Sequence, residues 1–367
     1  MTDEALSQDP LHPRRTADLL GHDAAERALL GAFNSGRLPH AWLITGPKGV
    51  GKATLAYRFA RFLLGQGGAH AGDGLFGAPP PPPSLDLDPA SALFRRIAAE
   101  GHADLLTVER SVNDRTGKLR GEIAVDDVRR LPGFFSLTAA EGGYRVAIVD
   151  SADEMNRNAA NALLKILEEP PARAVLLILA NAPGGLLPTI RSRCRRLTLR
   201  PLEDALVVEV LQRRLPEGAP EERQALARLA EGSPGRAIAL GRLGGVAVYT
   251  ELMDLLRPLP ELDIGKLHAF GDNLSRRENL PAYQVMTDLL GWWLTRLIRS
   301  AAAGPPPEIA GGEAALAMRL TQGRGLDRWL EVWEKVGRLV ERADSINLDR
   351  KQVVLNAFTT LARAARS

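Results

Sequence analysis

The stretch "GPKGVGKA" at residues 46–53 constrains this chain more than any other, because it nearly completes a phosphate-binding glycine loop, or P-loop. That motif requires glycine, any four residues, glycine, lysine, and then serine or threonine. Gly46, Gly51 and Lys52 match it, but Ala53 stands where the hydroxyl residue belongs. In a complete P-loop this hydroxyl helps to hold Mg²⁺ at the phosphates, and alanine has no oxygen to offer. The loop therefore predicts a phosphate cradle without its magnesium ligand.

The segments on either side support this interpretation. An apolar run at 41–46 predicts a strand, and residues 52–65 carry apolar side chains at helical spacing. A strand, a glycine loop and a helix, in that order, point backbone N–H groups at phosphates. Thr54 does not replace the missing hydroxyl, because successive side chains on a helix point about 100° apart. The candidate nucleotide-binding residues of the loop are Gly46, Pro47, Lys48, Gly49, Val50, Gly51, Lys52, Ala53 and Thr54.

Three further apolar runs, at 104–109, 144–150 and 174–181, predict more strands. The last is continuously apolar, which suits a strand buried on both faces of a parallel sheet. After Pro201 the pattern becomes helical to the end of the chain. The expected fold class is an α/β P-loop domain with a parallel sheet, followed by a small helical domain and an all-α C-terminal domain.

The expected domain boundaries follow these changes of pattern. We place the P-loop domain at 1–201, the small helical domain at 202–244 and the C-terminal helical domain at 245–367. Within the first, residues 65–89 are rich in glycine and proline and include five consecutive prolines. Such a run fits neither a helix nor a central strand, so we expect a flexible insertion there.

Charge and cysteine content exclude several classes of protein. The chain has 47 basic and 44 acidic side chains, so its bulk charge does not demand a nucleic-acid partner. Cys194 is the only cysteine, which excludes an internal disulfide and any site built from several cysteines. The N-terminal stretch is acidic first and has no apolar core, and no run of about 18 apolar residues follows. We expect no signal peptide, no membrane span and a cytoplasmic location.

The second half of an ATPase site should be an acid at the end of a neighbouring strand. Asp150 ends the run at 144–150 and suits a magnesium-side carboxylate. The next residue in enzymes of this kind is often the glutamate that activates water, and here it is Ser151. Asp153 and Glu154 are expected to begin the following helix, where the helix dipole favours acids. Two catalytic elements are thus missing, which predicts a site that does not hydrolyse ATP.

Two long motifs carry a resemblance to a known family. With "NALLKILEEPP" at 161–171 and "LILANAPGGLLPTIRSRC" at 177–194, the chain resembles the clamp-loader branch of the AAA+ ATPases. The resemblance covers about 16–245, and beyond it the chain matches mainly in its helical character. It implies an AAA+ domain, a helical lid at 202–244 and a helical collar that closes a ring. Shorter matching motifs are "LLGH" (19–22), "PHAWLITGPKGVGKATLA" (39–56), "DVRRL" (127–131), "GSPGRA" (232–237) and "NLDRKQVVLNAF" (347–358).

The resemblance implies a function in DNA replication. Clamp loaders are rings of five subunits that use ATP at subunit interfaces to place a sliding clamp on primed DNA. One subunit type is catalytically degenerate and lends an arginine finger to its neighbour, and by motif that residue is Arg193. The implied partners are motor subunits of the tau/gamma type and a delta subunit, with the sliding clamp and primer-template DNA reached through the complex. ATP is expected to bind weakly or not at all.

Several site residues keep a second interpretation. The run "RSRCRRLTLR" at 191–200 also reads as a basic loop and strand whose arginines pair with Glu168 or Glu169. Asn181 matches the position of a γ-phosphate sensor, or makes a strand-end hydrogen bond. Gly235 occupies the slot of a nucleotide-sensing arginine, which leaves that function in doubt. The other arginines of the run, which are Arg191, Arg195 and Arg196, are expected to be surface or interface charge.

Relatives often carry a zinc module of four cysteines after the P-loop helix, but this chain has His70 and no cysteine there, so we expect no zinc. The helically spaced tryptophans of the C-terminal domain are expected in its core or in a subunit interface. They are Trp292, Trp293, Trp329 and Trp333.

Two functions remain open. The chain is either a non-hydrolysing clamp-loader subunit or an active AAA+ motor in which Lys52 and Asp150 suffice for Mg²⁺-ATP. Ala53 and Ser151 favour the first. A free nucleotide kinase is less well supported, because it would need neither the "SRC" element nor a collar.

Overall fold

The computed structural model describes residues 9–66, 80–113, 117, 119–141, 143–304, 307–322, 326–346 and 348–366. The chain forms two compact units. The first comprises Met1–Val210 with Glu231–Arg236, and the second comprises Leu211–Ala230 with Ala237–Ser367. The expected lid segment at 202–244 is shared between them, so the three-domain division stays a prediction.

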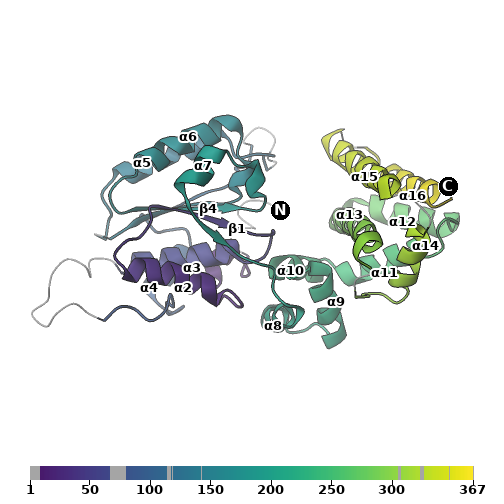
Figure 1. Cartoon of the computed structure of the whole chain (residues 1–367), viewed down its shortest axis with the longest axis horizontal. Coiled ribbons are helices and arrows are strands. Elements are labelled where there is room, and N and C mark those ends of the chain that lie inside the picture. The colour runs from purple at the N-terminus through teal and green to yellow at the C-terminus, as the bar shows by residue number, and fades with distance from the viewer. Residues whose placement is uncertain are drawn as a thin grey trace, which may run out of the picture. The chain divides into compact units, whose positions relative to one another are not determined.

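A five-stranded parallel sheet forms the centre of the first unit, in the order β2-β3-β4-β1-β5 (Figure 1). The predicted parallel sheet is confirmed, and β4 is buried along its whole length as its continuous apolar run indicates. Because parallel strands end at one edge, the residues that follow β1, β3 and β4 meet there. The strands are β1 (Ala41–Thr45), β2 (Leu105–Val108), β3 (Arg145–Val149), β4 (Ala174–Ala180) and β5 (Arg195–Thr198).

Helices cover both faces of the sheet, as Figure 1 shows. Side chains that alternate along the strands enter two separate cores, one on each face. One face packs against α2 (Asp23–Asn34), α3 (Lys52–Gly65) and α4 (Ala92–Ala98), and the other packs against α5 (Val125–Ser136), α6 (Arg157–Glu168) and α7 (Pro188–Arg193).

The P-loop helix α3 is anchored by a buried arginine. Arg61 is 2% exposed, and its guanidinium donates to the carbonyl oxygens of Arg14 at 2.9 Å and Thr16 at 2.7 Å. The ring of Phe94 lies 4.6 Å from its Cζ. Burial lowers the pKa of Arg61 to about 10, so it keeps its charge at neutral pH. This side chain joins α3 to the N-terminal segment and to α4.

The expected flexible insertion at 65–89 has contacts at its C-terminal end. Residues 67–79 lie outside the described residues. Leu85, in contrast, is buried in the core beside α3, and Asp86 accepts a hydrogen bond from Arg58 at 2.8 Å. The flexibility of the insertion stays a prediction, but its C-terminal end has partners in the first unit that composition does not reveal.

Helices are the only regular secondary structure in the described part of the second unit, which confirms the expected all-α C-terminal region. The lid segment, which the two units share, holds α8 (Asp204–Arg214), α9 (Pro220–Ala230) and α10 (Pro234–Arg242). They are followed by α11 (Gly245–Leu256), α12 (Ile264–Ser275), α13 (Leu280–Ala303), α14 (Glu313–Thr321), α15 (Leu326–Ile346) and α16 (Arg350–Arg366). None of the helices in the described ranges is both long and apolar enough to cross a membrane.

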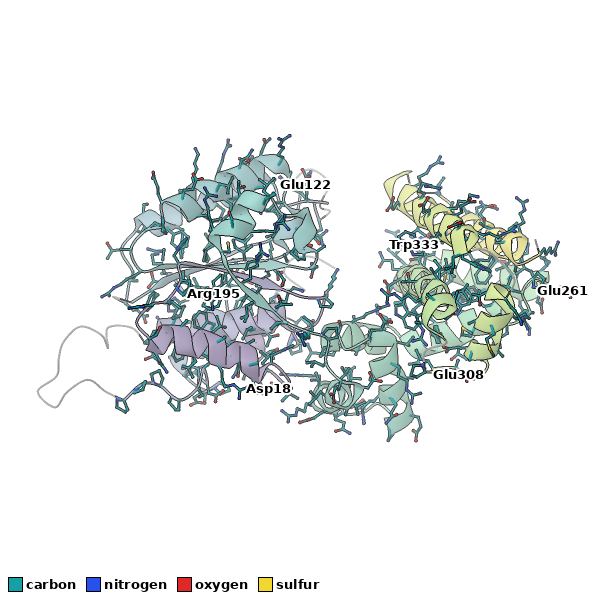
Figure 2. All side chains as sticks on the ribbon, viewed as in Figure 1. Asp18, Glu122, Arg195, Glu261, Glu308 and Trp333 are labelled. Carbon is teal, nitrogen blue, oxygen red and sulfur yellow. The ribbon has the colours of Figure 1, made fainter. Side chains whose placement is uncertain are left out.

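The C-terminal tryptophans divide between core and surface. Trp292, Trp293 and Trp329 are buried, and the indole N–H of Trp329 donates to the carbonyl oxygen of Leu320 at 3.0 Å. Trp333 is 45% exposed on α15 (Figure 2). Three of the four are therefore core residues of the second unit.

Replacing Arg61 by methionine should lower the free energy of unfolding by about 3 kcal/mol, because two buried carbonyl groups lose their donor. Urea denaturation followed by far-UV circular dichroism measures this. Arg27→Met is the matched control, since Arg27 is exposed on α2 and should change stability by less than about 0.5 kcal/mol. Equal transition midpoints for the two variants would contradict the anchoring role.

Candidate functional site

The glycine loop that joins β1 to α3 has the close backbone contacts that only glycine permits. Gly46 has φ +148°, and a Cβ there would lie 2.4 Å from the carbonyl oxygen of Leu199. Gly51, also at positive φ, precedes the first turn of α3. The glycine loop thus lies between a strand and a helix, which is the context that the motif requires.

A second backbone contact closes over the loop. The N–H of Gly235, in the first turn of α10, donates to the carbonyl oxygen of Gly49 at 2.8 Å. A Cβ on Gly235 would lie 2.9 Å from the Cα of Gly49. This contact explains why glycine stands in the slot expected for a nucleotide-sensing arginine. A side chain at this position would push the two backbones apart.

His22 is a site residue to which sequence reasoning assigned no role, although it lies in the "LLGH" motif. Its Nε2 donates to the carbonyl oxygen of Val50 at 2.8 Å, because a carbonyl group can only accept. The side chain is buried, and burial lowers the pKa of His22. A neutral His22, at the start of α2, therefore forms a hydrogen bond that holds the glycine loop in place.

Lys52 folds back onto its own loop. Its Nζ lies 2.8 Å from the carbonyl oxygen of Gly46, 2.8 Å from that of Pro47 and 2.8 Å from Oδ1 of Asn181. The ammonium group has three N–H donors, and each faces one of these acceptors. Burial lowers the pKa of Lys52 to about 8, against the opposing effect of Asp150 and Asp153. A phosphate would have to replace at least one of these contacts.

Asp150 and Asn181 meet near the lysine, at the ends of β3 and β4. Ser151 lies between them: its Oγ donates to Oδ1 of Asp150 at 3.3 Å and lies 3.5 Å from Nδ2 of Asn181. Ser151 has φ +56°, which is uncommon for a residue with a side chain. Burial raises the pKa of Asp150. The structure thus brings the predicted Lys52, Asp150 and Asn181 together, with a serine in the place of the water-activating glutamate.

As expected from the sequence, Asp153 and Glu154 lie in the first turn of the helix that follows β3, which is the short 3-10 helix Ala152–Glu154. The longer helix α6 begins at Arg157, with Asn156 as its N-cap. The Asp153 carboxylate also accepts from the backbone N–H groups of Asn181 at 3.0 Å and Ala182 at 2.8 Å. It fixes the chain just after β4, where Asn181 turns toward Lys52. Sequence spacing could not reveal this contact between segments that are distant in the sequence.

The two residues after the lysine show no arrangement for metal binding. Ala53 is partly buried, and its methyl group packs against the core on the α3 face of the sheet. Thr54 lies in the same first helical turn and is partly buried. In the part of the chain that the structure describes, no group of three or more His, Cys, Asp or Glu could hold a metal ion. His70 lies outside the described residues.

Arg193 ends α7 and points its guanidinium at α6. Its Nη2 lies 2.9 Å from Oε1 of Glu168, and its Nη1 donates to the carbonyl oxygen of Thr189 at 3.1 Å. The pairing with Glu168 was the structural alternative to a finger role. The side chain is 36% exposed, so both interpretations remain compatible with its position. The neighbouring arginines 195 and 196 are exposed on the edge strand β5, where Figure 2 labels Arg195.

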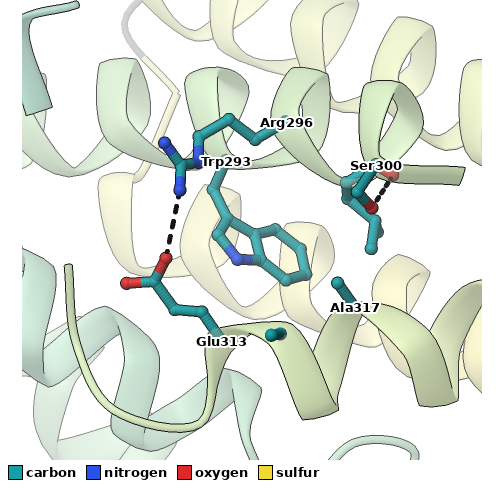
Figure 3. A pocket seen from close by; sticks show the side chains of 7 residues that line it. Trp293, Arg296, Ser300, Glu313 and Ala317 are labelled. Atoms are coloured by element: carbon teal, nitrogen blue, oxygen red, sulfur yellow. Dashed lines mark hydrogen bonds and ion pairs between the residues drawn. The ribbon is translucent and has the colours of Figure 1, made fainter. Parts of the chain in front are cut away.

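Two cavities elsewhere do not add to this site. Figure 3 shows one in the second unit, of about 20 Å³, beside the ion pair of Arg296 and Glu313. That volume holds about one water molecule. The other, of about 270 Å³, follows the edge strand β2, and none of its lining residues belongs to the P-loop.

The family model and the similar proteins reported below are all described as subunits of DNA polymerase III. Residues 21–203, about half of the chain, match the family model described as "DNA polymerase III, delta subunit". The chain is 36% identical to DNA polymerase III subunit delta' of Pseudomonas aeruginosa over 61% of each protein. It is 34% identical to the delta' subunit of Escherichia coli over 58% of this chain and 57% of that one. It is 30% identical to the Escherichia coli tau subunit over 62% of this chain and 32% of that one. The chain thus matches less than two thirds of the length of these relatives.

A parallel sheet with β1 between β4 and β5, a glycine loop before α3 and a helical C-terminal region define a P-loop protein of the AAA+ class. Within that class the matched region is similar to subunits of DNA polymerase III. The chain belongs to the family of the delta' subunits of bacterial DNA polymerase III.

The buried His22 predicts a pH dependence of stability. Its pKa in the folded chain lies below the unfolded value of 6.5, so the unfolded chain takes up the proton first as pH falls. The stabilising effect of neutral His22 on the free energy of unfolding is fully present above pH 6.5. It is lost as pH falls below 6.5, by about 1.4 kcal/mol for each unit by which the pKa is lowered. Urea unfolding at pH 7 and pH 5 should show a steeper loss for the wild type than for His22→Gln, which keeps an N–H donor but does not titrate. Equal losses in the two proteins would contradict this.

Proposed function

We propose that this chain is a non-hydrolysing, delta'-type subunit of a DNA polymerase III clamp loader, which helps to load the sliding clamp onto primed DNA. The observation that carries the proposal is the state of the P-loop, in which the backbone cradle is kept and the catalytic groups are lost. Lys52 is bound by its own loop, Ala53 stands in the place of the magnesium hydroxyl, and Ser151 stands in the place of the general base.

The geometry of the loop argues against turnover. Hydrolysis requires Mg²⁺ held by a P-loop hydroxyl and an acidic residue, and a group that orients the attacking water. Asp150 is buried with a raised pKa, which disfavours the carboxylate that a metal needs. The serine hydroxyl of Ser151 is no base at neutral pH. ATP therefore binds weakly or not at all in this proposal, and the chain carries no zinc.

The chain instead contributes Arg193 to a neighbouring subunit. A guanidinium carries five N–H donors, of which Glu168 and the Thr189 carbonyl group occupy two. The remaining donors and the partial exposure suit contact with a phosphate bound elsewhere. Such a finger stabilises the charge of the transition state and contributes about 10³–10⁵ in rate at the site that it completes.

The proposed partners follow from this assignment. They are motor subunits of the tau/gamma type and a delta subunit in a five-membered ring, in the cytoplasm. The sliding clamp and primer-template DNA are reached through the assembled complex. The polymerase activity of the holoenzyme is assigned to another chain.

An ATP-hydrolysing motor subunit is the alternative function. The close approach of Lys52, Asn181 and Asp150 favours it, because these groups surround the place of the γ-phosphate in active relatives of this fold. The contact of Gly235 with Gly49 disfavours it, since the slot of the nucleotide sensor is filled by backbone.

Clamp- and DNA-stimulated ATP hydrolysis by the reconstituted loader tests the two functions. Arg193→Ala should lower turnover by about tenfold or more, because the finger acts only in the transition state. Lys52→Ala should leave turnover close to the wild-type value. Arg195→Ala, in the same basic run but exposed on β5, is the matched control and should have little effect.

The proposal fails if Lys52→Ala is the damaging change and Arg193→Ala is not. In that case the cradle is a working site despite Ala53. Circular dichroism of each variant before assembly shows that the fold is intact.

A further inference from the structure

The ion pair between α6 and α7 joins two motifs that lie 25 positions apart in the sequence. Glu168, from "LEEPP", is the last residue of α6, and Arg193, from "SRC", is the last residue of α7. Glu168 Oε1 lies 2.9 Å from Arg193 Nη2, and the Thr189 carbonyl oxygen lies 3.1 Å from Nη1. The two acceptors thus hold the two terminal nitrogens of one guanidinium.

This arrangement restrains the Arg193 side chain but occupies only part of its hydrogen-bonding capacity. Each acceptor takes one N–H of a group that has five, in a planar and rigid fork. Arginine has large rotamer entropy, and a side chain that is already held loses less of it when a phosphate binds. Among the residues that the structure describes, Glu168 and Thr189 take two of the five N–H donors of Arg193.

We propose that Glu168 is a positioning residue for the arginine finger: its carboxylate orients Arg193 toward the nucleotide of the neighbouring subunit. The inference rests on the proposed function and deepens it. Glu168 acts through Arg193 and makes no contact with nucleotide.

The position of Glu168 supports this role in two ways. A carboxylate at the C-terminal end of a helix is unfavourable beside the negative end of the dipole, and a paired guanidinium offsets that effect. The pair is also partly exposed, at 50% for Glu168 and 36% for Arg193, so solvent keeps the attraction weak. A weak ion pair can orient the Arg193 guanidinium and still allow it to exchange a contact with Glu168 for one with a highly charged triphosphate.

Glu169 provides a matched control in the next position. It is exposed, it follows the last residue of α6, and within the described part of the chain its carboxylate forms no ion pair. A change there removes the same charge from the same surface without touching Arg193. A general electrostatic effect would therefore affect both positions alike.

The test compares Glu168→Gln with Glu169→Gln in the reconstituted loader. Glu168→Gln should lower kcat for clamp- and DNA-stimulated ATP hydrolysis about threefold to fivefold, the range expected for loss of a partly exposed ion pair, with KM for ATP unchanged. Glu169→Gln should leave both constants unchanged. An unchanged or raised kcat in Glu168→Gln overturns the proposal, since the carboxylate would then have no role or would compete with phosphate.

Combination with Arg193→Ala separates this inference from the function on which it rests. If Glu168 acts through the finger, Glu168→Gln should add no further loss in the Arg193→Ala background. A further loss there means that Glu168 has a structural role, which overturns the inference but leaves the finger. If Arg193→Ala alone does not lower turnover, the proposed function itself fails.

Discussion

The contacts of the Lys52 ammonium group hold together the segments that form the candidate site. One cation joins the glycine loop to the end of β4, through Gly46, Pro47 and Asn181. Asn181 is in turn fixed by Asp153, at the turn after β3. Three neighbouring strands are therefore tied together at one edge by groups that, in an active site, would face nucleotide. In the proposed function these interactions serve the fold and not catalysis.

Backbone contacts hold the glycine loop in place, in addition to the contacts of Lys52. Gly235 contacts Gly49 from one side, and His22 holds the Val50 carbonyl group from another. Both contacts are made by the chain itself. At position 53 the methyl group of the alanine packs on the core. The degenerate residue and the closed loop are thus physically consistent.

Sequence patterns predicted the elements of this site well and their contacts poorly. The strands could be read because β1, β3 and β4 are fully buried and hence mostly apolar, with Thr45 and Arg145 as the polar exceptions at strand ends. The glycine loop could be read because its backbone contacts admit no other residue. Asp153 was placed correctly at a helix start, but its contact with the backbone N–H groups of Asn181 and Ala182 could not be read, because those residues are distant in the sequence. The contact of Asp86 was missed in the same way, because its partner Arg58 lies in α3, before the glycine- and proline-rich run.

In the proposed function, a P-loop domain that does not hydrolyse ATP acts in catalysis through a different edge of its fold. Hydrolysis at its own site would need Mg²⁺ at a fixed place, and Ala53 offers no oxygen to hold it. As the proposed finger, Arg193 needs a rigid base and a fixed orientation, which α7 and the Glu168 carboxylate would supply. Because an exposed guanidinium is costly to order at the moment of reaction, a neighbouring acceptor that orders it in advance gives it an effect in the transition state. The residues of the glycine loop and the pair of Arg193 with Glu168 are therefore subject to separate requirements in this proposal.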